Sequence, residues 1–480
     1  MKEPFFVTIG LEVHVQLKTQ TKIFCSCAVR FASAPNSHVC PVCLGLPGVL
    51  PVLNQEVFRL GLRAVLAIGG TPSTLIRFDR KNYFYPDLPK GYQISQFADP
   101  LGSGGFIEIG AQESAKKIRI NRLHLEEDAG KLIHDQSDDS SHVDLNRAGT
   151  PLAEIVSEPD LESPEEAYEY LTHLKAVLKS IGVSECDMEK GQLRCDANIS
   201  LRKLKNQPLG KKVEIKNLNS FKAVKAALQH EIGRQTEALE KGSALFQETR
   251  LWDETKQKTF LMRSKEEAHD YRYFPEPDLV PFSVTAKEIH EARASLPELP
   301  KAKKERFMKE FQLSSYDAST LSTQKEVADF FEQAVKTSHM DAKGAANWIS
   351  GPVFAYLSEH NLSLDQTALT PALLAALAAL VQSGDVSLQA AKEKIFPEVI
   401  TQGLDPKALM KEKGLEQVSD DLALQRWVSE ALSENPKVVA DFKSGKESSA
   451  MFLVGQVMRK SQGKAHPQKA QEMVRKKLKE

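Results

Sequence analysis

The sequence lacks the features that mark several large classes of protein. No run of eighteen apolar residues occurs among its 480 residues, so neither a membrane-spanning helix nor a membrane partner is expected. The first residues, Met1 to Phe6, lack the apolar stretch of a secretory signal, which predicts a cytoplasmic protein. In that compartment the six cysteines are not expected to form stabilising disulfide bonds.

Several enzyme motifs are missing as well. The sequence contains neither a P-loop motif nor a Gly-x-Gly-x-x-Gly turn after a strand, so a nucleotide is not expected in either of those folds. It also lacks the Gly-x-Ser-x-Gly turn of α/β-hydrolases and a Ser-rich amidase segment. Neither of these two kinds of serine enzyme is therefore expected.

The most regular pattern that is present runs from Val7 to Lys18, where aliphatic residues alternate strictly with polar residues or glycine. Such alternation predicts a β-strand with one face in a core. Glu12 and His14 then stand side by side on the polar face, about 7 Å apart. They could share a hard cation there, although the strand alone also fits a solvated face with a chance histidine.

Four of the six cysteines follow this strand in two close pairs. Cys25 and Cys27 form the first pair, and twelve residues separate them from Cys40 and Cys43. This arrangement is typical of a tetrahedral zinc site made of thiolates. Because protein would fill all four positions, the predicted zinc is structural. The alternative, four unrelated buried cysteines, requires a coincidence of spacing.

Acidic side chains recur at the ends of later strands. Glu126, Glu127 and Asp128 end a strand that begins near Ile118, with a change of phase that suggests a β-bulge at Asn121 and Arg122. Glu154 lies in another extended segment, and the strand from Gly191 to Arg202 carries Arg194 and Asp196 on its polar face. Clustered carboxylates persist where cations lie between them. An antiparallel sheet lined in this way suits cation-assisted phosphoryl transfer.

The segment from Phe78 to Tyr92 interleaves cations with aromatic rings. Rings can stack on bases while cations meet phosphates, which fits a surface for a nucleotide or an RNA end. A proline-bounded loop whose rings fill a small core fits equally well. The residues concerned are Arg80, Lys81, Tyr83, Phe84, Tyr85, Lys90 and Tyr92.

Composition changes along the chain predict an α+β protein of three domains. Prolines between Pro275 and Pro300 mark the end of the strand-rich part, and Gly403 with Pro406 marks a second boundary. We expect an N-terminal domain over 1–292 with an antiparallel sheet and flanking helices, an all-α domain over 293–405, and a small all-α tail over 406–480. From Val457 onward the tail carries eight Lys/Arg against two Glu, which suggests a polyanionic partner or only a solvated end.

Six motifs together resemble one family. They are Ile9 to Val15, Phe78 to Asp87, Leu123 to Gly130, Asp144 to Leu152, Leu193 to Ser200 and Lys216 to Ser220. The chain resembles the GatB family, the B subunits of the aspartyl/glutamyl-tRNA amidotransferases, and the likeness extends to Phe452 to Met458 near the end. Ala153 stands where a larger aliphatic residue is expected, a packing change with little effect on chemistry.

The resemblance implies a cradle domain over 1–292, which contains the zinc knuckle predicted at 25–43, then a helical domain and a tail domain. It also implies ATP-dependent amidation of Glu on tRNA-Gln, and often of Asp on tRNA-Asn. This subunit would phosphorylate the side-chain carboxylate of the mischarged aminoacyl-tRNA. Ammonia would come from the glutaminase subunit GatA, in a heterotrimer that also contains GatC.

Site residues also follow from the resemblance. His14, Glu126 and Glu154 would hold Mg²⁺, while Glu12, Glu127 and Asp196 would complete a second cation position or its outer shell. Lys81, Tyr83, Arg194 and Lys216 would face ATP. The tail would grip tRNA through Arg459, Lys460, Lys464, Arg475, Lys476 and Lys477. Two rival interpretations are a non-enzymatic RNA-binding protein and a purely scaffolding subunit; the acid-lined strands favour the enzyme.

Overall fold

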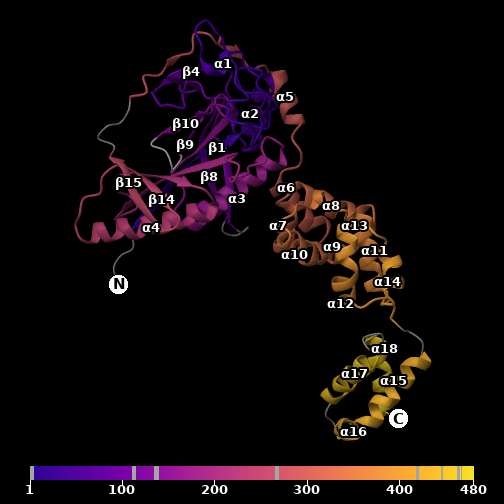
Figure 1. The fold of residues 1–480 in the computed structure, drawn as a ribbon. Helices are drawn as coiled ribbons and strands as arrows, with labels where there is room; N and C mark the ends of the chain where they lie inside the picture. The colour runs from indigo at the N-terminus through magenta and orange to yellow at the C-terminus, as the bar shows by residue number, and fades with distance from the viewer. Residues whose placement is uncertain are drawn as a thin grey trace. The chain divides into compact units, whose positions relative to one another are not determined.

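The computed structural model describes residues 5–110, 115–134, 140–264, 270–417, 421–444, 447–461, 465 and 467–479. The chain divides into two compact units, Met1–Pro300 and Lys301–Glu480, and each is considered by itself (Figure 1). Among the described residues, no helix has both the length and the apolar character that a membrane crossing requires.

The first unit is built around one large sheet. Its strands lie in the order β15 (Lys258–Ser264), β14 (Glu248–Asp253), β13 (Val213–Leu218), β12 (Leu193–Arg202), β1 (Phe6–Gln16), β11 (Pro151–Ser157), β8 (Lys116–Glu127), β6 (Gly102–Ser103) and β2 (Thr71–Pro72), with β7 (Phe106–Ile109) paired to β8. The pairs are antiparallel except for β13 and β14, which are parallel. Helix α4 (Phe221–Glu240) supplies the crossover that a parallel pair needs.

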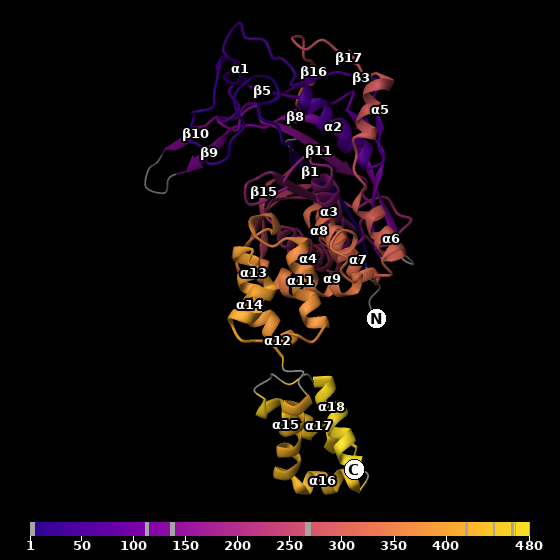
Figure 2. The same cartoon turned by 90° about the vertical axis from the view of Figure 1, so that its right-hand side faces the viewer.

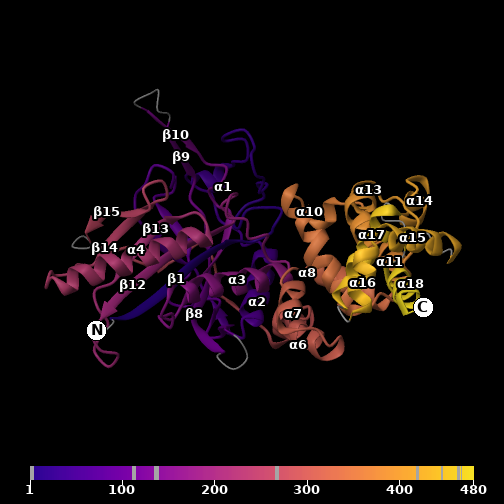
Figure 3. The same ribbon diagram turned by 90° about the horizontal axis from the view of Figure 1, so that it is seen from below.

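The two faces of this sheet differ in chemistry. On one face, the aliphatic side chains of β1, such as Ile9 and Val13, are fully buried in the core. Helices α3 (Pro164–Ser180) and α4 cover this face, as the view from below shows (Figure 3). Ser163 and Ser220 cap these helices by accepting hydrogen bonds from backbone N–H groups in the first turn. The other face carries the polar side chains of β1.

Smaller elements lie over the polar face. A three-stranded sheet contains β16 (Phe274–Pro275), β4 (Asp79–Asn82) and β5 (Tyr92–Ser95), and near it lies the short helix α1 (Pro41–Leu44) (Figure 1). The hairpin of β9 (Lys131–His134) and β10 (Ser141–Asp144) projects beside them (Figure 2). Strand β17 (Phe282–Ser283) pairs with β3 (Leu75–Ile76), and helices α2 (Gln55–Ala67) and α5 (Ala286–Ala294) complete the unit.

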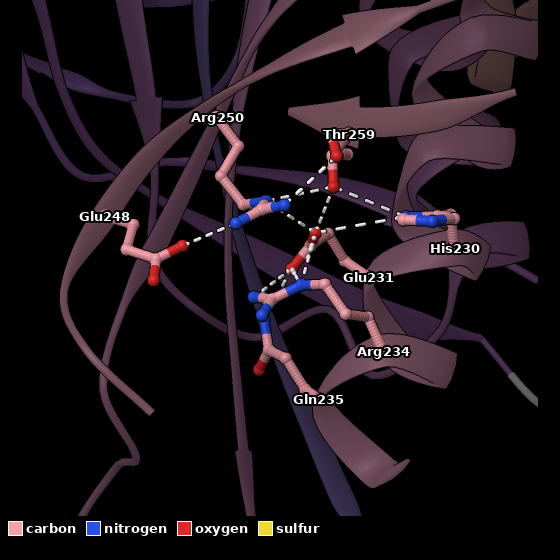
Figure 4. Close-up of polar contacts among 7 residues, drawn as sticks. All are labelled: His230, Glu231, Arg234, Gln235, Glu248, Arg250 and Thr259. Carbon is pink, nitrogen blue, oxygen red and sulfur yellow. Dashed lines mark hydrogen bonds and ion pairs between the residues drawn. The ribbon is translucent and has the colours of Figure 1, made fainter. Parts of the chain in front are cut away.

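A buried charge cluster fixes α4 to the hairpin of β14 and β15 (Figure 4). Glu231 is fully buried and accepts a two-pronged hydrogen bond from Arg234, with nitrogen–oxygen distances of 2.9 Å. Arg250 Nε lies 3.2 Å from the same carboxylate, and Thr259 and Gln235 also donate to it. Arg250 in turn contacts Glu248 at 2.7 Å. The helix and the hairpin are therefore joined by ionic contacts as well as by packing.

The second unit is helical. Its apolar side chains form two separate clusters, one between Phe307 and Met410 and the other between Leu424 and Leu478. The predicted α+β class is confirmed. The division at 292 and 405 into three domains stays a prediction. The helices of this unit are α6 (Pro300–Glu310), α7 (Ser315–Ser322), α8 (Lys325–Lys336), α9 (Ala342–Trp348), α10 (Phe354–Glu359), α11 (Pro371–Gln382), α12 (Leu388–Ala390), α13 (Phe396–Gln402), α14 (Pro406–Glu412), α15 (Asp421–Glu434), α16 (Pro436–Lys443), α17 (Ser448–Lys460) and α18 (Pro467–Lys479).

Candidate functional site

Three side chains from three strands converge on the polar face of the large sheet. His14 Nε2 lies 3.5 Å from a carboxylate oxygen of Glu126 and 3.4 Å from one of Glu154. One ligand atom from each of the three lies within 4.8 Å of the other two. An imidazole and two carboxylates at this spacing can hold a divalent cation.

Strand register explains this convergence. His14 of β1 lies directly opposite Glu154 of β11. On the far side of β11, Glu154 is opposite His124 of β8, and Glu126 is two residues further along. Side chains directly opposite each other in a sheet point to the same face, as do residues two apart in one strand. All four groups therefore share the polar face.

His124 is a member of this group that the sequence analysis did not single out. Its Nε2 lies 3.1 Å from Glu154 and 3.8 Å from Glu126. Only 3% of its surface is exposed. The alternation along β8 that places Glu126 on the polar face places His124 there as well, so the signal was present in the sequence.

Burial and charge act against each other on these groups. Burial lowers the pKa of His14, but its hydrogen bond to Glu154 and the charges of Glu154 and Glu126 outweigh this effect and raise it. The same balance raises the pKa of His124 to about 9. Burial raises the pKa of each carboxyl group, but contacts with the two imidazoles lower both overall. A metal ion bound by His14 would therefore displace a proton.

A second polar group lies on the adjoining strands. Lys216 Nζ lies 2.6 Å from Asp196 and 3.3 Å from Glu214, and Asn198 donates to Glu12 at 2.9 Å. Asp196 is opposite Glu12 in the pairing of β12 with β1. Glu12, Asp196 and Lys216 therefore continue the polar face toward β13.

Arg194 and Glu127 have other partners. Arg194 is opposite His14, and its guanidinium lies 3.0 Å from Asp128. Glu127 is buried, pairs with Lys90 and accepts a hydrogen bond from the backbone N–H of Ile94. The structure thus brings Glu12, His14, Glu126, Glu154, Asp196 and Arg194 onto one face, whereas Glu127 lies in a separate ion pair.

Lys81 approaches the metal-ligand group from β4. Its ammonium lies 5.0 Å from the ring centre of Tyr271 and 5.9 Å from that of Tyr83. Burial lowers the pKa of Lys81, but the charge of Glu126 and the neighbouring tyrosines together outweigh burial and raise it. Burial raises the pKa of Tyr83 to about 12. Lys81 therefore adds a positive charge beside the carboxylates, with tyrosine rings around it.

The four cysteines of the knuckle are close together. Their sulfur atoms all lie within 4.8 Å of one another, so they could hold a metal ion. The hydrogen bond from Cys25 and the backbone N–H of Cys40 lower the pKa of Cys43 to about 4, with a smaller contribution from the charge of Lys22. Cys186 and Cys195 are buried in the core of the first unit.

The predicted tRNA-binding cations lie on two helices of the second unit. Arg459 and Lys460 end α17, and Lys460 forms an ion pair with Glu434. Arg475, Lys476 and Lys477 are exposed on α18. Lys464 lies outside the described residues.

The sequence was compared with models of known families. Residues 7–290 match the model described as the GatB/GatE catalytic domain, and residues 329–478 match the model described as the GatB domain. The chain belongs to the GatB family. The matched catalytic domain contains every residue of the polar face described above.

Curated relatives align with this GatB-family chain over almost the whole length of both proteins. A protein of Thermoanaerobacter pseudethanolicus is 50% identical over 470 residues, which cover 98% of either chain. One of Caldanaerobacter subterraneus is 51% identical with the same coverage, and one of Persephonella marina is 50% identical over 475 residues. Each of the three is named as the B subunit of an aspartyl/glutamyl-tRNA(Asn/Gln) amidotransferase.

Proposed function

We propose that this chain is the subunit of a tRNA-dependent amidotransferase that activates the mischarged amino acid. It phosphorylates the side-chain carboxylate of Glu on tRNA-Gln, or of Asp on tRNA-Asn, with ATP as the donor. Ammonia from a glutaminase subunit, GatA, then displaces phosphate from the acyl phosphate and leaves the amide. The convergence of His14, Glu126 and Glu154 on a face that also carries cations is the observation that supports this proposal.

The three converging side chains fit Mg²⁺. Carboxylate oxygens are its preferred protein ligands, and Mg²⁺ usually keeps several waters, so a site with few protein ligands suits it. When bound, the ion neutralises charge on the transferred phosphoryl group. His124 donates to Glu154 and orients that carboxylate, as outer partners of metal ligands commonly do.

The surrounding cations would position ATP and the substrate carboxylate. Lys81, Arg194 and Lys216 reach the face from β4, β12 and β13, so they approach the phosphates from different sides. Tyr83 contacts the Lys81 ammonium through its ring and limits the positions that the ammonium can take. Glu12 and Asp196 would complete a second cation position. Glu127, bound to Lys90, would support the end of β8.

Assembly and domain roles complete the proposal. The family resemblance implies a heterotrimer with GatA and GatC. GatA would supply the ammonia, because this sequence lacks a Ser-rich amidase segment. Residues 1–292 would form the catalytic cradle, 293–405 a helical domain and 406–480 a tRNA-binding tail. The knuckle would bind zinc as a structural ion.

The reaction is tested with the purified chain, its partner subunits, ATP, glutamine and mischarged tRNA. We expect amide formation on the aminoacyl-tRNA coupled to release of ADP, with Glu-tRNA and Asp-tRNA assayed side by side. Amide formation without ATP consumption would contradict the kinase role. Activity with free glutamate in place of the charged tRNA would contradict the substrate class.

The tail has its own test. Replacing Lys476 and Lys477 together by Ala removes two exposed charges from α18. Fewer counterions are then released on binding, so we expect weaker tRNA binding and a salt dependence flattened by about one to two units of slope. The matched control replaces Lys437 and Lys443, exposed on α16 of the same module, and should leave the slope unchanged. An unaltered slope in the variant of Lys476 and Lys477 would remove α18 from the interface.

The zinc site is tested by elemental analysis. We expect about one zinc per chain, and its loss in Cys40→Ser or Cys43→Ser, because each substitution removes a ligand. Cys186→Ala removes a buried cysteine outside the cluster and should keep the zinc. A folded wild-type protein without bound metal would refute this assignment.

A further inference from the structure

Lys22 is a fully buried lysine beside the cysteine cluster. None of its surface is exposed to solvent. Its ammonium nitrogen lies 2.8 Å from the carbonyl oxygen of His38, 3.4 Å from that of Leu145 and 3.5 Å from Cys43 Sγ. Among the residues that the structure describes, no carboxylate lies within ion-pair distance of it. The proposed reaction assigns it no role.

The surroundings of Lys22 require a counter-charge. An ammonium group removed from water costs several kcal/mol unless a negative group and hydrogen bonds compensate it. The two carbonyl oxygens supply hydrogen bonds but no net charge. Cys43 is the remaining contact, and its sulfur carries a full negative charge when it is a thiolate. Four thiolates around one divalent ion leave a net charge of about −2.

We propose that Lys22 is the counter-cation of a zinc–thiolate centre formed by Cys25, Cys27, Cys40 and Cys43. Its ammonium group donates a hydrogen bond to Cys43 Sγ. Its positive charge neutralises part of the negative charge that remains when four thiolates bind one divalent ion. It is a positioning residue, because it acts on the metal ligand and touches no substrate. The inference rests on the proposed zinc site and does not depend on the amidotransferase reaction.

The same lysine joins the centre to the segment that leads into β11. Its contact with Leu145 is one of several across this boundary. Asn36 donates to Asp144 at 3.0 Å, and the backbone N–H of His38 donates to Asn146 at 2.8 Å. The knuckle and this segment therefore behave as one structural unit.

Gly149 lies beside the centre in a backbone conformation that favours glycine, with φ at 81°. A Cβ atom there would lie 3.4 Å from Lys22 Cδ and 3.6 Å from Cys43 Cβ, which are ordinary van der Waals distances. The N–H of Gly149 donates to the carbonyl of Asp128, whose carboxylate holds Arg194. The segment beside the centre is thus hydrogen-bonded to one edge of the polar face.

The test measures zinc affinity in the full-length chain by competition with a chelating dye. Lys22→Met and Lys22→Gln remove the charge, and Gln keeps a hydrogen-bond donor. We expect about 10- to 100-fold weaker zinc binding in both, in the range typical of lost outer-shell partners. Lys18→Met removes an exposed lysine four residues away and should change nothing. Wild-type zinc affinity in both Lys22 variants would overturn the proposal.

A second measurement separates this role from ordinary packing. Thermal stability is compared with zinc bound and after chelation. If Lys22 is a counter-cation, Lys22→Met should lower the Tm of the zinc-bound protein. It should leave the Tm of the zinc-free protein unchanged or raise it, because the wild-type lysine is then a buried charge without a partner. A lysine that matters only for packing would lower both Tm values equally, and that result would also overturn the proposal.

Discussion

Replacing Glu126 by Gln is expected to lower kcat/KM for amide formation on mischarged tRNA by on the order of 10²- to 10³-fold. The substitution keeps the shape of the side chain but removes one of the two carboxylates within 4.8 Å of His14. The cation would then be held by one charge fewer, and the phosphoryl group would be less well neutralised. His14→Ala is expected to have an effect of similar size, because it removes a ligand outright.

Two controls make this prediction specific. Glu158→Gln changes an acid that contacts Asn121, away from the cluster, and should leave kcat/KM unchanged. Raising the Mg²⁺ concentration should restore part of the activity of Glu126→Gln, because the loss arises from weaker metal binding. Amide formation at wild-type rates in both Glu126→Gln and His14→Ala would exclude the phosphoryl-transfer role of this face.

Replacing Glu231 by Gln is expected to destabilise the first unit by about 3 kcal/mol or more. The fully buried carboxylate is the shared acceptor of Arg234 and Arg250 (Figure 4). Its loss takes this partner from Arg234 and leaves Arg250 with Glu248. Glu237→Gln, on the exposed side of the same helix, is the matched control and should have little effect. Equal stability of the two variants would show that the cluster contributes no more than a surface ion pair.

The effect of Glu231 should depend on pH. Burial raises the pKa of Glu231, but hydrogen bonds from Arg234, Thr259 and Gln235 lower it below its usual value of 4.5. A carboxylate with a lowered folded-state pKa contributes stability above the unfolded-state value, and this contribution is lost as the pH falls through the folded-state value. Wild-type stability should therefore decline below about pH 4.5, whereas Glu231→Gln should show a flatter acid limb.

Tryptophan fluorescence can follow this unit alone. Trp252 is the one tryptophan of residues 1–300, and it is buried in β14 beside the cluster. In a background with Trp348→Phe and Trp427→Phe, the fluorescence of Trp252 would follow urea unfolding of this unit. Unfolding free energies at several pH values would then be compared with and without Glu231→Gln. An acid limb of the same slope in both proteins would contradict the proposed ionic role.

The sequence predicted the first strand and the residues on its polar face. The alternation from Val7 to Lys18 predicted β1, which spans Phe6–Gln16, and it placed Glu12 and His14 on one face as observed. The predicted bulge at Asn121 is confirmed, because the pairing of β8 with β11 skips that residue. Each of these features depends on residues close together in the chain.

Local sequence patterns did not predict the features that depend on residues far apart in the chain. His14 lies opposite Glu154 because of the register between β1 and β11. The periodicity of the sequence does not determine which residues of two strands pair. The parallel pairing of β13 with β14 was missed, because an antiparallel sheet was expected from the sequence. The roles of Lys22 and Glu231 were missed for a related reason, since a buried charge is recognised only from its partners.

The parallel pair also has a consequence for folding. Strand β14 joins the sheet beside β13 only after the chain has crossed the core face as α4, so both elements must be ordered before the hairpin can dock. The hairpin of β14 and β15 also lies at the edge of the sheet, outside β1, β11 and β12. Residues 248–264 are therefore expected to acquire protection from amide exchange after β1, β12 and β11, and to be the first part of the sheet to open under mild denaturant.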